Sequence, residues 1–259
     1  MRLDRALAAD VRTALRSRAV IGYLAIQLLA GVVFVDRRGA TTLSTVLYIW
    51  AAMVILVFFA WWAGRSHRAH PRPDPEPAAT ARSIFALIVA VGMLLLGSRI
   101  YLELGVVLFA CGSGAWAWAA WRAGGLGDAR QRLLRDPLPF LPLWLLIAVP
   151  RLLIGGPGFL VAVVVALPSG IGQQLLYLIG LYSPLEAVRR RTDVAAVTAA
   201  FVFAGIHIPF VIEANGGDAL ASLANLVLFQ ASVGVIAVLA FVRHRAAVPI
   251  GVTHALAIA

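Results

Sequence analysis

Residues 43–63 read LSTVLYIWAAMVILVFFAWWA, a stretch without a single charged side chain. About 20 predominantly apolar residues suffice for a helix to cross the hydrocarbon core of a bilayer, so this stretch is expected to form a transmembrane helix. Seven further apolar runs lie at residues 19–35, 84–98, 104–121, 138–154, 158–182, 194–212 and 219–242. The sequence therefore predicts an all-α, polytopic integral membrane helical bundle of about eight transmembrane helices. A last apolar run, 248–259, is too short to span and is expected to enter the membrane only partway or to belong to a longer chain.

The overall composition also indicates a membrane protein. Hydrophobic residues make up 61% of the 259 residues and charged residues only 13%, which leaves too little polar surface to solvate a soluble globule. The net charge of +10, taken alone, is compatible with a nucleic-acid-binding protein. However, the basic residues are arginines at the ends of apolar runs, where they anchor helices, and they form no continuous basic stretch interleaved with aromatic residues. The predicted partner is the lipid bilayer, and no nucleic acid is expected.

The distribution of arginine between alternate loops predicts the topology, because short cytoplasmic loops retain positive charge. One set of alternate loops contains Arg2, Arg5, Arg12, Arg16, Arg18, Arg65, Arg68, Arg72, Arg82, Arg122, Arg130, Arg132, Arg135, Arg189, Arg190, Arg191, Arg243 and Arg245. The other set contains only Arg37, Arg38, Arg99 and Arg151, partly balanced by Asp36, Glu103, Glu213 and Asp218. This asymmetry predicts a multi-pass protein of the cell membrane with its N-terminus in the cytoplasm.

The charge and proline pattern divides the chain into four parts. Residues 1–18 carry apolar residues at helical spacing between arginines, which is typical of an amphipathic helix on the cytoplasmic surface. Residues 19–63 form an N-terminal unit of two spans. Residues 64–83 form a cytoplasmic linker rich in arginine and proline, in which the prolines of the segment 71–77 prevent a helix. Residues 84–259 make up the main helical membrane domain.

Polar side chains inside the predicted spans are concentrated in the C-terminal half of the chain. Gln173 and Gln174 lie in the sixth span, His207 lies in the seventh, and His254 lies in the terminal run. Polar groups are costly in a membrane unless they are satisfied, so they are candidates for a functional site. The plainer interpretation is hydrogen bonding between helices. Gln27, in the first span, is interpreted as a lipid-facing packing residue.

Three motifs in this half occur in a distinctive order. They are Gln173-Gln-Leu-Leu-Tyr-Leu178, then Phe203-Ala-Gly-Ile-His207, then His254. Their order and separation on successive helices resemble the intramembrane protease family that includes the type II CAAX prenyl endopeptidases and the bacteriocin-processing or immunity (Abi) proteins. The resemblance covers residues 167–259, about the last third of the chain.

The chain departs from that family at several motif positions. The family has two adjacent glutamates followed four residues later by arginine, and its last motif is a histidine followed by asparagine or a similar residue. Here the glutamates are replaced by Gln173 and Gln174, the arginine by Leu178 and the asparagine by Ile258. The phenylalanine and histidine of the second motif and the histidine of the third are retained.

The resemblance implies an endopeptidase that hydrolyses peptide bonds of membrane-associated or lipidated peptides. It assigns Gln173, Gln174, His207 and His254 to the positions of catalytic residues. It also assigns His207 and His254 to positions that hold a divalent metal such as zinc. These four residues are expected to surround one cavity inside the membrane.

The glutamine pair leaves two functions open. A glutamine amide has no accessible basic lone pair, and losing a general base costs about 10²- to 10⁴-fold in rate; glutamine is also a poor zinc ligand. Either His207 or His254 acts as the base while the amides donate hydrogen bonds to an oxyanion, or the chain is an inactive scaffold or binding protein on the same fold. The nearest carboxylates, Glu186 and Asp193, are expected to be loop charges. A transporter or channel is less favoured, because neither inverted repeats nor paired ionisable residues are found.

Overall fold

The computed structural model describes residues 16–63, 104, 107–108, 111–112, 137–183, 185–186, 191–244 and 246–259. Within these residues the structure is helical and contains no strand. The chain separates into two compact units, unit 1 (1–55 and 189–235) and unit 2 (56–188 and 236–259). The predicted surface segment 1–18, the linker 64–83 and the spans 84–98 and 104–121 lie wholly or mostly outside the described residues.

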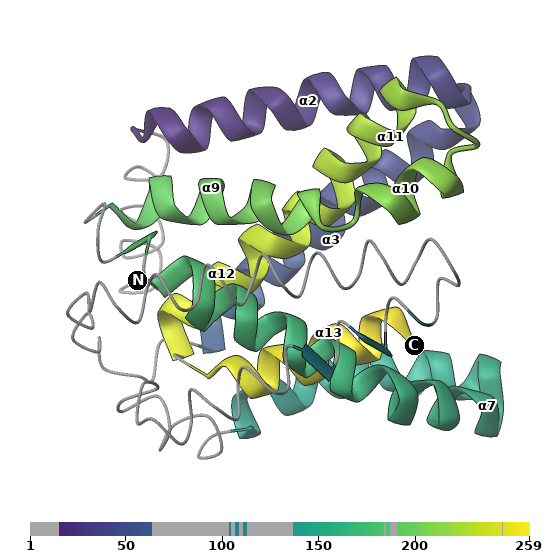
Figure 1. Cartoon of the computed structure of the whole chain (residues 1–259), viewed down its shortest axis with the longest axis vertical. Helices are drawn as coiled ribbons and strands as arrows, with labels where there is room; N and C mark the ends of the chain where they lie inside the picture. Colours follow the sequence, from purple (N-terminus) through teal and green to yellow (C-terminus); the bar gives the residue numbers. More distant parts are fainter. Residues whose placement is uncertain are drawn as a thin grey trace, which may run out of the picture. The chain divides into compact units, whose positions relative to one another are not determined.

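Unit 1 is built around helix α2 (Arg18–Arg38), which packs against α9, α11 and the π-helical segment η5 (Figure 1). Its other elements are a 3₁₀ turn (Ala40–Thr42), the first part of α3 (Leu43–Ala63), α9 (Thr192–Gly205), α10 (Ile208–Ala214), α11 (Ala219–Asn225) and η5 (Leu226–Ala231), which leads into α12 (Ser232–His244). The core between them contains Ala30, Phe34, Val46, Ala224, Val227 and Leu228.

Local sequence signals explain both ends of α2. The hydroxyl of Ser17 caps the helix by accepting a hydrogen bond from the Val20 N–H, as serine at this position commonly does. The helix ends at Gly39, whose φ of 93° is readily adopted only by glycine and whose N–H bonds to Val35 O. Its 21 residues extend about 31 Å at the α-helical rise, which matches the hydrocarbon thickness of a bilayer.

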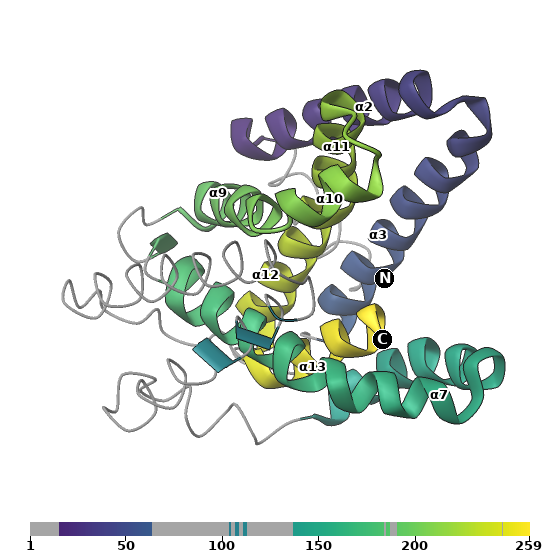
Figure 2. The same cartoon turned by 45° about the vertical axis from the view of Figure 1, so that its right-hand side comes forward.

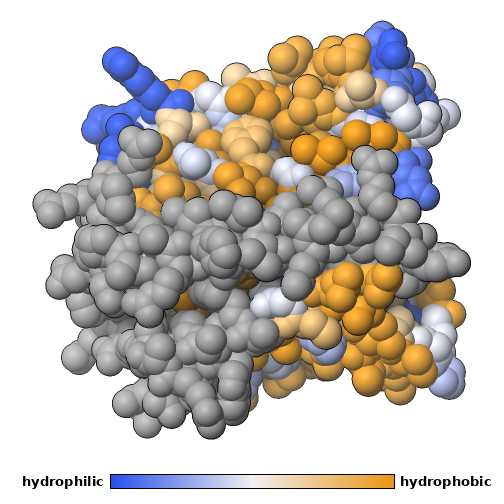
Figure 3. Space-filling view, viewed as in Figure 1, coloured by the Kyte–Doolittle hydropathy of each residue, from blue (hydrophilic) through white to orange (hydrophobic). Residues whose placement is uncertain are grey.

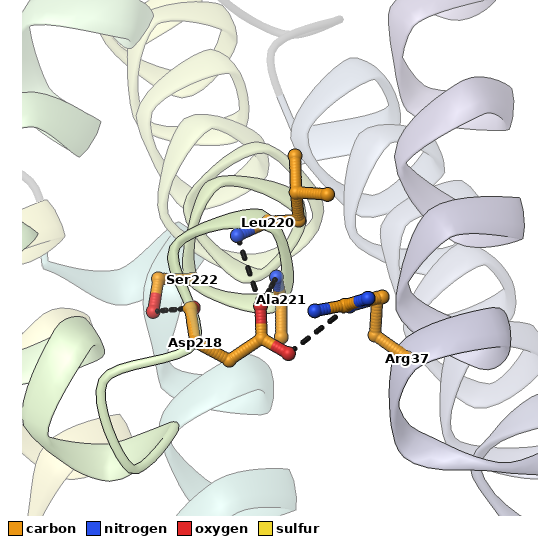
Figure 4. A network of polar contacts seen from close by, with 5 residues as sticks. All are labelled: Arg37, Asp218, Leu220, Ala221 and Ser222. Atoms are coloured by element: carbon orange, nitrogen blue, oxygen red, sulfur yellow. Dashed lines mark hydrogen bonds and ion pairs between the residues drawn. The ribbon is translucent and has the colours of Figure 1, made fainter.

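Polar contacts hold α2 at both ends. At its N-terminus, Ser17 Oγ donates to Asp193 (2.5 Å), which also pairs with Arg191 (2.8 Å). At its C-terminus, Arg37 pairs with Asp218 at 3.1 Å, as Figure 4 shows. In Figure 3 the surface along α2 is hydrophobic between hydrophilic ends. This distribution is the one expected of a helix that crosses a membrane.

Asp218 is both the partner of Arg37 and the N-cap of α11. Its Oδ1 accepts from the N–H groups of Leu220 and Ala221, each at 3.0 Å. The hydrogen bond from Ala221, supported by Arg37 and Leu220, holds the pKa of the Asp218 carboxyl below its ordinary value of 3.8. A lowered pKa means that this carboxylate stabilises the fold above pH 3.8 and ceases to do so as the pH falls through the pKa of the folded state.

Asp218→Asn is expected to remove this pH dependence without removing the cap, because asparagine caps helices as well as aspartate does. The thermal unfolding midpoint of the starting protein should fall more steeply than that of the variant once the pH drops below 3.8. The measurement is thermal unfolding in detergent from neutral to acid pH. Parallel curves for the two proteins would show that Asp218 does not contribute to acid sensitivity.

A buried polar network connects α2 to η5. Gln27 is only 2% exposed, so its interpretation as a lipid-facing residue is wrong. Its Nε2 donates to Val227 O (2.6 Å) and lies 2.8 Å from the Tyr23 hydroxyl. Ser232 Oγ donates its single proton to Leu228 O at 2.5 Å. In the 3.2 Å contact between Tyr23 and Ser232, the tyrosine must therefore be the donor.

Unit 2 contains a helix that reverses direction. Its elements are the 3₁₀ turn η3 (Leu138–Phe140), α7 (Leu141–Leu175), the π-helical segment η4 (Leu176–Tyr182), the end of α12 and α13 (Ala247–Ile258). Helical geometry is interrupted at Gly156 (φ 55°, ψ −145°), between Pro150 and Pro157. The predicted boundary between the spans 138–154 and 158–182 falls at this interruption.

Contacts with α13 show that the two arms of α7 fold back along each other. Trp144 Nε1 donates to Thr253 Oγ1 (2.9 Å), whereas a Cβ placed on Gly170 would lie 2.8 Å from the Cβ of Ala255. In a straight helix Trp144 and Gly170 would be about 39 Å apart, too far for both to reach one turn of α13. The reversal can be followed in Figures 1 and 2.

Glycines allow a close backbone crossing between the second arm of α7 and α13. A Cβ on Gly170 would lie 2.7 Å from Ala255 N and 2.8 Å from Gly251 O, and a Cβ on Gly251 would lie 2.6 Å from Ile171 Cα. Small residues at such crossings are typical of packed membrane helices. On the other arm, Arg151 donates to Leu256 O (3.3 Å) in the last turn of α13, where carbonyls lack helical partners.

Three helical stretches of the described residues are long and apolar enough to cross a membrane, namely Arg18–Arg38, Leu141–Tyr182 and Ala219–Val242. The pair Thr192–Gly205 and Ile208–Ala214, bent by 58°, makes a fourth if it is one broken span. These helices support the predicted helical membrane protein. The terminal run forms α13, which at 12 residues extends about 18 Å and is too short to span.

Candidate functional site in the membrane helices

His207 lies at the break between α9 and α10, inside the predicted span 194–212. The axes of the two helices differ by 58°, and Pro209 in the first turn of α10 has no N–H with which to continue the α9 hydrogen bonds. In membrane proteins, an interrupted helix is tolerated where protein or a water-filled cavity surrounds the freed backbone groups. The break therefore places a titratable ring at a point typical of functional sites.

Phe203 holds the imidazole of His207 in one orientation and one tautomer. His207 Nδ1 lies 2.9 Å from Phe203 O, and the two rings are 4.9 Å apart at an interplanar angle of 53°. Because a carbonyl only accepts hydrogen bonds, Nδ1 must carry the proton. Nε2 is then the nitrogen with a lone pair, able to accept a proton or a hydrogen bond. The four-residue spacing of the motif thus has a physical reason in the geometry of one helical turn.

Gln173, Gln174 and His254 lie at the crossing of α7 and α13 in unit 2. Gln174 follows Gly170 by one turn, on the face of α7 that meets α13, and it is completely buried. His254, 8% exposed, immediately precedes Ala255, which contacts Gly170. The half-buried Gln173 donates from Nε2 to Ser169 Oγ at 3.0 Å.

The structure describes the four predicted site residues in two separate units. The structure brings Gln173, Gln174 and His254 to one helix crossing in unit 2, and it describes His207 within unit 1. That all four residues surround one cavity remains a prediction. The π-helical segment η4 begins two residues after Gln174, and such segments often occur at functional sites.

The two nearby carboxylates differ from the solvated loop charges that were expected. Glu186 is buried, with 2% of its surface exposed. Asp193 is bound by Ser17 and by Arg191, so it is part of the contact that holds α2. Neither burial nor pairing was visible in the sequence, because both residues stand next to an arginine-rich loop.

The divalent metal implied by the resemblance does not fit the donors of the described residues. No group of three or more His, Cys, Asp or Glu side chains among them could hold a metal ion. A catalytic zinc takes about three such ligands, and glutamine amides substitute for them poorly. The chemistry of this site is therefore derived from the imidazole and the amides alone.

Both amides of the glutamine pair have buried atoms without a hydrogen-bond partner. Gln174 Nε2, Gln174 Oε1 and Gln173 Oε1 are among the buried atoms of the described residues that lack one. Buried polar groups are nearly always paired in folded proteins, so these atoms identify a site in their own right. No protein-family model matches the chain, and neither a curated protein nor a solved structure is significantly similar to it.

Proposed function

We propose that this protein is a multi-pass cell-membrane protein of about eight spans, with a cytoplasmic N-terminus, that acts as an intramembrane endopeptidase of the CAAX-protease-like type on membrane-associated or lipidated peptides. The orientation of His207 carries the proposal. Its Nδ1 bonds to Phe203 O, which leaves Nε2 free of a proton and holds the ring in one orientation. A histidine fixed in this way is suited to general-base catalysis.

In the proposed reaction, His207 Nε2 accepts a proton from a water molecule, whose oxygen attacks the carbonyl carbon of a peptide bond. The attack produces a tetrahedral intermediate with negative charge on the former carbonyl oxygen. The imidazolium then returns the proton to the leaving nitrogen, and the C–N bond breaks.

The alternative is a catalytically inactive binding protein on the same fold. One observation favours it, namely that the fully buried Gln174 is an amide rather than a carboxylate. A pair of adjacent carboxylates would be costly to bury, whereas neutral amides reduce that cost and keep the ability to form hydrogen bonds. Loss of the carboxylates removes the strongest candidate base but leaves a surface that recognises polar groups.

A cleavage assay in liposomes distinguishes the two functions. Purified starting protein and the double variant Gln173→Glu, Gln174→Glu are incubated with a panel of prenylated and unmodified membrane peptides, and products are identified by mass spectrometry. Cleavage by the starting protein supports the endopeptidase. Cleavage by the double variant alone supports the binding protein, and absence of cleavage by both across the panel contradicts the endopeptidase.

A further inference from the structure

The side chain of Gln174 combines complete burial with a complete lack of hydrogen bonds. It is 0% exposed, and neither its Nε2 nor its Oε1 has a partner among the described residues. The Oε1 of the adjacent Gln173 is also buried and unpaired, although its Nε2 bonds to Ser169. Two adjacent residues therefore present one unused amide nitrogen, which can donate two hydrogen bonds, and two unused acceptor oxygens.

These atoms are expected to have a binding partner, because a buried polar atom without a hydrogen bond destabilises the folded protein. It is more expensive in a membrane protein, since lipid supplies no donors or acceptors. A hydrophobic side chain of similar volume at position 174 would avoid the cost. The persistence of an unpaired amide at the α7–α13 crossing is accordingly explained by a ligand that pairs with it.

The unpaired atoms define what the ligand must offer. It needs an acceptor for Gln174 Nε2 and donors for the two Oε1 atoms. Phosphodiester and ionised carboxylate groups offer acceptors only, and lipid chains offer neither. The main chain of an extended peptide offers both, because each residue carries one N–H and one C=O.

We infer that Gln174, together with Gln173, binds the main chain of an extended peptide. Gln174 Nε2 donates to a peptide carbonyl, Gln174 Oε1 accepts from a peptide N–H, and Gln173 Oε1 accepts from a second N–H. This inference rests on the proposed function only in taking a membrane-associated peptide as the ligand. It adds that recognition is directed at the backbone and does not depend on one side-chain sequence.

Binding requires the packing over Gln174 to open, since the amide is enclosed. Two neighbouring features favour such a movement. Gln173, one residue away, is only half-buried and is thus the nearer to the surface. The segment that follows, η4, is π-helical over Leu176–Tyr182, and π-helical turns are less stable than α-helical ones and often mark functional sites.

The test uses the full-length protein in nanodiscs and a fluorescent, N-palmitoylated peptide of about eight alternating alanine and serine residues, too short for a stable helix. A second probe replaces alternate peptide bonds by esters, which keep the carbonyl and lack the N–H. The variant is Gln174→Met. The matched control is Gln230→Met, which makes the same substitution in the other π-helical segment, η5.

The starting protein is expected to bind the amide probe more tightly than the ester probe. Gln174→Met should weaken binding of the amide probe by about 10- to 100-fold and abolish the difference between the probes. Gln230→Met should preserve both the affinity for the amide probe and the difference between the probes. Thermal unfolding of Gln174→Met should occur at no lower temperature than that of the starting protein, because the substitution removes unpaired buried atoms.

Three results would overturn the inference. They are no saturable binding of the amide probe by the starting protein, equal binding of both probes by it, and unchanged preference in Gln174→Met. The comparison of the two probes on the starting protein needs no variant, so it holds even if the substitution disturbs the fold. Peptide cleavage that is unchanged in Gln174→Met would sink the inference and leave the endopeptidase standing. Backbone-dependent binding without cleavage would support the inference and contradict the endopeptidase.

Discussion

Gly170→Ala is expected to lower the free energy of unfolding by about 3 kcal/mol, the upper part of the range for overpacking a well-packed site. The new methyl group would lie 2.7 Å from Ala255 N and 2.8 Å from Gly251 O. Both neighbours are backbone atoms of α13, so they cannot rotate away as a flexible side chain could. The two helices must separate, and unit 2 loses its closest crossing.

The control for this substitution is Gly158→Ala in the same helix. No atom lies within 4 Å of a Cβ placed there, so alanine should be neutral or stabilise by up to about 1 kcal/mol through its higher helix propensity. Unfolding of both variants is followed by circular dichroism during titration of mixed micelles with a denaturing detergent. Equal stability of Gly170→Ala and Gly158→Ala would show that α7 and α13 do not cross at this point.

His207→Asn is expected to slow peptide cleavage by about 10²- to 10⁴-fold, the typical cost of losing a general base. Asparagine has no nitrogen lone pair at the position of Nε2. Its amide can nevertheless replace the bond from Nδ1 to Phe203 O. The same geometry already occurs one helix later, where Asn215 Nδ2 donates to Val211 O four residues earlier at 2.7 Å.

Because that hydrogen bond is retained, the thermal unfolding midpoint of His207→Asn should match that of the starting protein. A loss of cleavage with unchanged stability would assign the base to Nε2. The measurement is the cleavage rate in liposomes, with thermal unfolding in parallel. Cleavage by the variant at the starting rate would show that another group acts as the base.

The helices and most of their ends could be predicted from the sequence, because they depend on short-range properties. Apolar runs of membrane length predicted α3 at 43–63 and the stretch 219–242 at the bounds that the structure has. The separation of the predicted spans 138–154 and 158–182 coincides with the interruption of α7 at Gly156. The bend at His207 was not predicted, although Pro209 was its local signal, because the run 194–212 is predominantly apolar and long enough for one span.

The residues of the candidate site could be predicted from the sequence, whereas their burial and hydrogen-bond partners could not. Phe203 and His207 were identified in the sequence as one motif, and the structure places both the carbonyl and the ring of Phe203 against the imidazole. The unpaired state of the Gln174 amide was not predictable. Whether a buried polar group finds a partner depends on neighbours that a linear sequence does not reveal.

The sequence by itself determined that this is a helical membrane protein, where most of its described helices begin and end, and which residues carry polar chemistry. These properties follow from hydrophobicity, helical periodicity, capping residues and chain breakers, each of which acts over a few residues. Only the tertiary structure decided that Gln27 is buried against Val227 and that α7 folds back so that both its arms contact α13. The same holds for the enclosure of Gln174 at that crossing. Such pairings join residues up to 200 positions apart, and they are selected by the packing of whole helices rather than by any local preference.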